Sequence, residues 1–369
     1  MIHQIILTVA AVTAINVVLA VLLVIAERYL ADFGECTLTV NDQKKLDVKG
    51  GSTLLATLSR EKIFLPSACG GRGTCAYCKC RIQSGAGPLL PTEIPLLSSE
   101  EIENQVRLAC QVKVKQDMAI TIPEELFAIQ EFRASVKEIR RLTHDIKLLR
   151  LSLLDPGEIS FKSGQYIQLK SQPYADIRER VSRAYSISSP NHVKNAIDLI
   201  VRLVPEGICT TWVHEYLREG ETVSFVGPMG DFFLRDGRGE IIMVAGGSGM
   251  APMVSILHEM IHTNNERKVT YFFGAVTRRD LFYLDEMNAF RQKLPNFKFI
   301  PALSEPLPED SWDGETGLIT EILGKYLKGK DTSDMQGYLC GSPGMIQASI
   351  QVMKEHHIEG DRIFFDPFA

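Results

Sequence analysis

The chain has 369 residues, a length that favours two or three domains over one. Its 40 Lys and Arg residues against 45 Asp and Glu residues give a formal net charge of −5. There is no basic excess to neutralise a phosphate backbone, so we expect no nucleic acid among the partners. A hydrophobic fraction of 45% and a charged fraction of 23% are typical of a globular protein with buried cores, and they exclude a disordered or fibrous class.

The N-terminal segment is strongly apolar. Residues 5–26 form 22 consecutive positions without a formal charge, and a helix of that length, at ~1.5 Å per residue, reaches across the ~30 Å hydrocarbon core of a bilayer. No Lys or Arg precedes the run, unlike in a secretory signal. We expect a transmembrane anchor over residues 1–28, with a buried core helix as the alternative. Arg28 and the lysines behind it favour a cytoplasmic location for the remaining domains.

The next segment alternates between apolar and polar residues. Two such runs on either side of Asn41-Asp42 predict a hairpin over residues 36–48. Leucines at helical spacing then predict a helix within residues 52–65, with Ser52 or Thr53 as the N-cap.

Four of the eight cysteines lie within residues 69–80. Cys69, Cys75 and Cys78 follow the spacing C-x5-C-x2-C in a glycine-rich loop, and Cys110 follows after 31 residues. Four thiolates hold a 2Fe-2S cluster, and glycines let three of them converge from one short segment. Zinc is the alternative, but zinc sites usually bring two close cysteine pairs. We therefore predict that these four cysteines bind a 2Fe-2S cluster.

Residues 129–234 show short alternating runs, over 131–154 and 161–169, which are typical of an antiparallel barrel. Arg183 offers a cation for a pyrophosphate, Tyr185 a flat face for an isoalloxazine ring, and Ser186 a hydroxyl for the flavin N5 edge. Twenty residues further on, a predicted helix start offers free N–H groups to an anion, and its candidate residues are Gly207, Thr210 and Thr211. Each signal is weak alone, and an ordinary surface strand is the alternative for residues 183–186.

Residues 239–369 predict a parallel sheet. The apolar run 240–245 leads into a glycine turn and then a helical pattern, an arrangement that cradles phosphate. Further strand-like runs cover 269–274 and 297–303, and ligands of such sheets bind at the carboxyl ends of the strands. The candidate glycines are Gly246, Gly247 and Gly249. Cys340 is expected at another strand end, with a buried core cysteine as the alternative.

The nucleotide preference depends on Glu305, which follows the run 297–303. A carboxylate can accept a hydrogen bond from a ribose 2′-hydroxyl, but it repels a 2′-phosphate. Arg278 and Arg279 could instead attract that phosphate. We expect NADH to be preferred.

The order of these motifs resembles the ferredoxin-NADP reductase superfamily fused to an N-terminal 2Fe-2S ferredoxin. It is more closely similar to the F-subunit family of the sodium-translocating NADH:quinone reductases, which shares the single N-terminal membrane helix and the five-residue first gap between cluster cysteines. Other family-like stretches are Arg107–Val112, Phe273–Ala275, Leu281–Tyr283 and Pro308–Trp312.

The resemblance implies a multidomain α+β and α/β fold. Its expected parts are a transmembrane helix (1–28), a β-grasp 2Fe-2S ferredoxin domain (33–128), an antiparallel FAD-binding barrel (129–234) and a parallel-sheet NAD-binding domain (239–369).

The resemblance also implies an NADH dehydrogenase of the inner membrane, with one membrane span and cytoplasmic domains. Electrons pass from NADH through FAD to the 2Fe-2S cluster and on to a quinone-reductase complex, with possible coupling to sodium transport. Cys340 is expected at the nicotinamide edge, Phe368 beside the flavin, and Ser186 at its reactive edge. One alternative is a membrane-anchored reductase that feeds an oxygenase or another acceptor. A non-enzymatic redox sensor or electron carrier is the alternative of another class.

Overall fold

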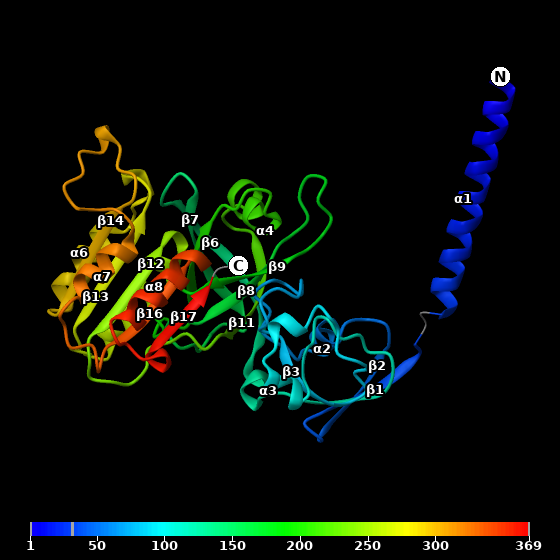
Figure 1. Cartoon of the computed structure of the whole chain (residues 1–369), viewed down its shortest axis with the longest axis horizontal. Helices are drawn as coiled ribbons and strands as arrows, with labels where there is room; N and C mark the ends of the chain where they lie inside the picture. Colours follow the sequence, from blue (N-terminus) through cyan, green and yellow to red (C-terminus); the bar gives the residue numbers. More distant parts are fainter. Residues whose placement is uncertain (1, 31–32, 368–369) are drawn as a thin grey trace. The chain divides into compact units, whose positions relative to one another are not determined.

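The computed structural model describes residues 2–30 and 33–367, and it describes side chains at 6–7, 9–22, 33–127 and 129–366. The chain divides into two compact units (Figure 1). The first lies within residues 1–65 and 71–128, and the second within residues 66–70 and 129–369.

The first element is the helix α1, Ile2–Leu30, which has 29 residues. The helical part of the sequence prediction therefore agrees with the structure. Among the residues whose side chains are described, no helix combines the length and the hydropathy needed to cross a membrane.

The rest of the first unit is a five-stranded mixed sheet in the order β2-β1-β5-β3-β4. Strand β1 is parallel to β5, and the other neighbouring pairs are antiparallel. Leu54 and Leu58 of the helix α2 are fully buried in the same core as the strand residues. The bounds are β1 Glu35–Val40, β2 Lys44–Lys49, α2 Leu54–Arg60, β3 Lys79–Ser84, α3 Ser99–Glu103, β4 Val106–Leu108 and β5 Met118–Thr121.

Local chemistry explains two of these elements. Asn41 and Asp42 adopt φ values of 52° and 57° in the β1–β2 turn, which Asn and Asp tolerate better than other non-glycine residues. The predicted hairpin is therefore confirmed. Thr53 caps α2 by accepting a hydrogen bond from the Ala56 N–H at 3.2 Å. The helix ends at Arg60, earlier than the predicted range allowed, and Lys62 turns the chain with a φ of 58°.

The second unit contains a six-stranded antiparallel sheet in the order β10-β7-β6-β11-β8-β9. A bridge between Ile187 and Leu199 joins the chain after β9 to β10, so the two edges of the sheet meet and the sheet is barrel-like. The bounds are β6 Gln130–Arg141, β7 Ile146–Asp155, β8 Tyr166–Lys170, β9 Ser182–Ser186, β10 Ala196–Arg202 and β11 Thr222–Met229.

The predicted run over residues 161–169 was wrong in its first half. Strand β8 begins only at Tyr166. Gly164 has a φ of +105°, and a Cβ there would lie 2.4 Å from the Phe232 carbonyl oxygen. This distant contact fixes a turn where alternation alone predicted a strand.

The second unit also contains a six-stranded parallel sheet in the order β15-β14-β13-β12-β16-β17. Helices α5 and α6 cover one face, and α7 and α8 cover the other. This confirms the predicted parallel sheet. The bounds are β12 Ile241–Gly246, α5 Met250–His262, β13 Val269–Ala275, α6 Leu284–Lys293, β14 Phe297–Leu303, β15 Glu315–Thr316, α7 Ile319–Leu327, β16 Gln336–Gly341, α8 Pro343–Glu355 and β17 Ile363–Pro367.

The core beneath α5 and α6 continues into the barrel-like sheet. Ile146 of β7 and Ile200 of β10 belong to the same buried cluster as Met250 and Met253 of α5. The two sheets of the second unit thus share one hydrophobic core.

Candidate functional site

Strand β9 presents the first group of predicted residues. It pairs with β8 so that Tyr166 lies opposite Ser186, and Leu169 lies opposite Arg183. Ser186 is 3% exposed, and its Oγ has no hydrogen-bond partner among the described residues. An unpartnered buried hydroxyl is costly. Ser186 is therefore suited to a hydrogen bond with a bound group such as a flavin.

The Tyr185 side chain is half-buried. Its hydroxyl is enclosed beside Cys209, and burial raises the pKa of Tyr185 well above its usual value, so the phenol stays neutral. A neutral aromatic ring with an accessible face fits the apolar ring system of a flavin.

The helix α4, Ile208–Thr211, begins where the sequence predicts an anion-binding turn, with Gly207 as its N-cap. The Thr210 Oγ1 lies 3.3 Å from the Val204 carbonyl oxygen and 3.2 Å from the Gly207 carbonyl oxygen, and it accepts the Val204 N–H at 3.2 Å. A Cβ on Gly207 would lie 2.5 Å from this hydroxyl. Thr210 thus shapes the turn from within, whereas Thr211 is half-exposed at the end of the helix.

The glycine turn follows β12. Gly246 ends the strand, Gly247–Gly249 forms a short 3-10 turn, and α5 begins at Met250. Gly247 has a φ of +55°, and a Cβ on Gly249 would lie 2.2 Å from the Cys340 carbonyl oxygen. Backbone N–H groups at the start of a helix of this length suit phosphate. The turn therefore fits the phosphates of a dinucleotide.

Cys340 lies near the carboxyl end of β16, opposite Ala245 of β12, as predicted. Its side chain is fully buried in the core beneath α5, and burial raises the pKa of its thiol. Its backbone, rather than its sulfur, forms the wall against Gly249. A contact between this thiol and nicotinamide stays a prediction. Phe368 lies outside the described residues.

Sequence reasoning did not identify Arg202, at the end of β10. A Cβ on Gly247 would lie 3.5 Å from the Arg202 Nη1, so the guanidinium lies beside the glycine turn. The Arg202 Nε donates to the Asp145 carboxylate at 2.8 Å, and the Thr143 hydroxyl donates to the same carboxylate at 2.8 Å. An oriented arginine at such a turn suits a pyrophosphate. No local sequence signal could have found it, because the fold alone joins β10 to the turn.

Glu305 is exposed just after β14. Its N–H donates to the Val276 carbonyl at 2.9 Å, which places it at the carboxyl ends of β13 and β14. Arg278 is held elsewhere, because its Nη1 donates to the Asp310 carbonyl at 2.6 Å. Of the two competing arginines, Arg278 thus has an intramolecular partner.

We predict that NADH is preferred over NADPH by at least about tenfold in kcat/KM, which corresponds to ~1.4 kcal/mol of transition-state binding. The change Glu305→Arg should narrow this ratio, because it removes a carboxylate that repels a 2′-phosphate. The control Glu309→Arg makes the same charge change at an exposed position nearby. Steady-state kinetics with both nucleotides provide the measurement. Equal use of both by the unmodified protein would contradict the role of Glu305.

The first unit carries three of the predicted cluster ligands. Cys78 and Cys110 are 1% and 5% exposed, and Cys75 is half-buried. A hydrogen bond with Cys110, burial, and the charge of Cys75 raise the pKa of Cys78. Crowded thiols of this kind favour a bound cation that holds them as thiolates. Cys69, on the segment 66–70, is also buried.

Among the described residues, no three His, Cys, Asp or Glu side chains are grouped so as to hold a metal ion. The fit of the cysteines to iron therefore rests on the interactions of Cys78 and on the comparisons below.

A hydrogen-bond donor lies beside one of these cysteines. The Gln111 Nε2 donates to the Cys110 Sγ at 3.6 Å, and the Gln111 Oε1 accepts from the Thr92 hydroxyl at 3.0 Å. Gly73 leaves room for this amide, since a Cβ there would lie 2.4 Å from the Gln111 Nε2. N–H groups directed at ligand sulfurs raise the reduction potential of iron-sulfur clusters.

We predict that Gln111→Leu lowers the midpoint potential of the cluster by about 20–60 mV. This range corresponds to one hydrogen bond of about 0.5–1.5 kcal/mol in a one-electron couple. A redox titration followed by electron paramagnetic resonance measures it. Gln83→Leu, which removes an exposed glutamine on β3, is the control. An unchanged potential in Gln111→Leu would show that the amide does not act on the cluster.

Three protein-family models match the chain. The 2Fe-2S iron-sulfur cluster binding domain matches residues 38–115, the oxidoreductase FAD-binding domain matches 133–234, and the oxidoreductase NAD-binding domain matches 243–351. The F subunit of the Na(+)-translocating NADH-quinone reductase of Neisseria meningitidis serogroup C is 35% identical over 99% of this chain and 100% of that protein. The protein of that name from Psychrobacter cryohalolentis is 36% identical over 98% of each chain.

The chain belongs to the F-subunit family of the Na(+)-translocating NADH-quinone reductases. Solved structures outside this family share its fold. A cytochrome P450 reductase of Amycolatopsis is 26% identical, with a TM-score of 0.73 over 90% of this chain and 98% of that chain. A ferredoxin reductase in carbazole 1,9a-dioxygenase is 24% identical, with a TM-score of 0.70.

The protein is an NADH-dependent flavin and iron-sulfur oxidoreductase, and its cofactors are FAD, a 2Fe-2S cluster and NADH. The alternative of a non-enzymatic carrier is wrong, because matched FAD-binding and NAD-binding domains occupy most of the second unit.

Proposed function

We propose that this protein is the electron-input subunit of a membrane-bound NADH:quinone reductase complex that couples electron transfer to sodium transport. Relatives that match it from end to end carry that name. The observation that carries the proposal is that the unpartnered Ser186 hydroxyl and the Gly246–Gly249 turn belong to one compact unit. One unit thus offers binding groups for both the hydride donor and its acceptor.

The residues of the second unit divide the work of binding. Ser186 and Tyr185 orient the flavin ring, while Arg183 and the Gly207–Thr211 turn hold its pyrophosphate. Gly246, Gly247 and Gly249 hold the dinucleotide, with Arg202 beside them and Glu305 at the ribose. Bound FAD supplies the conversion of one two-electron transfer into two one-electron transfers. Cys69, Cys75, Cys78 and Cys110 bind the cluster that receives these electrons.

The proposal places the protein in the inner membrane through residues 1–28, with the ferredoxin (33–128), FAD-binding (129–234) and NAD-binding (239–369) domains in the cytoplasm. Support comes from the 22 uncharged positions of residues 5–26 and from Arg28 behind them. The β-grasp identification of the first sheet is part of this proposal, supported by the parallel pairing of β1 with β5.

Removing residues 1–28 should release the protein from membranes and leave NADH oxidation with an artificial acceptor intact, because every cofactor motif lies behind the deleted segment. Fractionation of membranes and a ferricyanide assay give the two measurements. A fragment that stays with the membrane would argue against the anchor. A folded fragment that no longer reduces its flavin would argue against the modular arrangement.

Purification of the full chain in mild detergent, with mass spectrometry of the co-purifying subunits, tests the complex. Partner subunits of a quinone reductase would support the proposal. A second candidate is a reductase that feeds an oxygenase, which the similarity to a cytochrome P450 reductase favours. Co-purification with an oxygenase, and with no quinone-reductase subunit, would establish that candidate instead.

A further inference from the structure

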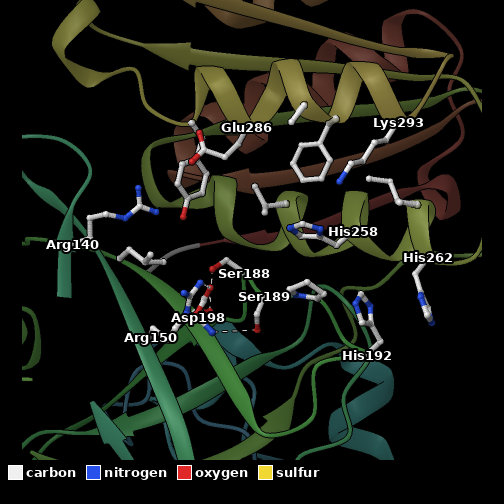
Figure 2. Close-up of a pocket in the computed structure, with 17 residues that line it drawn as sticks. Arg140, Arg150, Ser188, Ser189, His192, Asp198, His258, His262, Glu286 and Lys293 are labelled. Carbon is white, nitrogen blue, oxygen red and sulfur yellow. Dashed lines mark hydrogen bonds and ion pairs between the residues drawn. The ribbon is translucent and has the colours of Figure 1, made fainter. Parts of the chain in front are cut away.

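A cavity of about 810 Å³ lies in the second unit, between strands of the barrel-like sheet and the helices α5 and α6 (Figure 2). Its volume suits a drug-sized organic ligand. The residues that line it include none of Arg183, Tyr185, Ser186 or the Gly246–Gly249 turn. The cavity is therefore separate from the flavin and dinucleotide groups described above.

The charges on the barrel side of the cavity largely cancel. The Arg150 guanidinium donates to both carboxylate oxygens of Asp198, at 2.8 and 2.7 Å. Arg140 and Arg150 also each pair with Glu138 at 3.3 Å. Two cations thus face two carboxylates. The Ser188 and Ser189 hydroxyls are bonded to the backbone of Asp198, so this wall has little binding capacity left.

The opposite end of the cavity is basic. Figure 2 shows Lys293 there with His258, His192 and His262, while Glu286 lies toward Arg140. Lys293 has no ion pair or hydrogen bond among the described residues, and the His192 and His262 rings stack at 4.3 Å. Burial together with the charges of His192 and Lys293 lowers the pKa of His258 to about 4, although Asp198 acts in the opposite direction. Three neutral imidazoles and one unpaired ammonium group therefore face the cavity at neutral pH.

Apolar groups lie between these two ends. The His258 ring contacts the Phe290 ring edge-on, with centroids 4.9 Å apart. Val254 of α5 and Leu148 of β7 line the same space. One unpaired cation matches a single negative charge, since a dianion would bring one uncompensated charge into a partly enclosed site.

We propose that this cavity binds a small organic carboxylate monoanion with an apolar body. The carboxylate accepts hydrogen bonds from Lys293 and His258, and the apolar body lies along Phe290, Val254 and Leu148. Such a ligand contacts both the barrel-like sheet and the helices of the parallel sheet. It would therefore act as an effector on the second unit, at a site separate from that of NADH.

The test uses 4′-fluorobiphenyl-4-carboxylate and its neutral carboxamide as probes, each titrated into the full chain in detergent with saturating NAD+ and followed by fluorine NMR. The carboxylate should bind with one-to-one stoichiometry and about tenfold or more tightly than the carboxamide, as one charge-assisted hydrogen bond provides. Lys293→Met should abolish this preference. Arg291→Met removes a neighbouring cation of α6 that does not line the cavity, and it should leave the preference intact.

Equal affinity for the two probes would overturn the proposal. So would a preference that survives in Lys293→Met, or displacement of the carboxylate by NAD+. Flavin absorbance and the rate of NADH oxidation without the probe should be unchanged in both variants, because Lys293 and Arg291 lie outside the catalytic groups. This control separates a loss of binding from a loss of folding.

Discussion

Replacing Cys75 with alanine is expected to abolish the paramagnetic signal of the reduced 2Fe-2S cluster while NADH still reduces the flavin. Cys75 is the least buried of the four predicted ligands, so its loss removes a metal–sulfur bond without opening a core. The flavin-binding and dinucleotide-binding groups lie in the second unit and are untouched. Electron paramagnetic resonance, iron and sulfide assays and rapid-mixing absorbance together give the result.

The matched control is Cys80→Ala. Cys80 lies on β3 just after the cluster loop, is 3% exposed, and has a pKa raised to about 12 mainly by burial. As a packed thiol outside the ligand set, it should be replaceable with about two irons per chain retained. A normal signal in Cys75→Ala, or loss of the signal in both variants, would refute the ligand assignment.

Replacing Gly249 with alanine is expected to slow flavin reduction by NADH at least about a hundredfold. The new Cβ would lie 2.2 Å from the Cys340 carbonyl oxygen and 2.6 Å from its carbon. Two backbone segments must therefore separate by roughly 1 Å, and displacements of that size near reacting groups cost about 10²-fold in rate. Stopped-flow absorbance at saturating NADH measures the rate.

Gly344→Ala is the control for this change. Gly344 lies in the first turn of α8, and a Cβ there would meet nothing within 4 Å. It should therefore reduce its flavin at the normal rate. Dithionite, which needs no dinucleotide site, should reduce both variants equally. A normal NADH rate in Gly249→Ala would show that the contact between the turn and β16 does not position the dinucleotide.

Much of the fold could be predicted where local chemistry determines it. The parallel strand β14 matches the predicted run 297–303, because strands buried on both faces are continuous apolar runs. The hairpin around Asn41-Asp42 and the glycine turn after β12 follow from residues that favour those conformations.

Long-range contacts explain the rest. The late start of β8 depends on Gly164 meeting Phe232, and the position of Arg202 depends on β10 lying beside the glycine turn. Neither proximity has a local signature. Cys340 illustrates a mixed outcome, because its strand position could be predicted, whereas the burial of its side chain depends on how α5 packs over the sheet. The sequence also contains no signal for the cavity, whose lining comes from both sheets' layers.

The shared core of the second unit bears on how hydride donor and acceptor meet. Ile146 and Ile200 pack among α5 residues, and the fully buried Ser255 of α5 donates to the Ser189 carbonyl at 2.9 Å. Parting the two sheets would expose this core to water, unlike a hinge motion between loosely joined lobes. Productive encounters should thus arise from motion of the nicotinamide and nearby side chains within a fixed frame. The rate of flavin reduction should accordingly respond weakly to solvent viscosity.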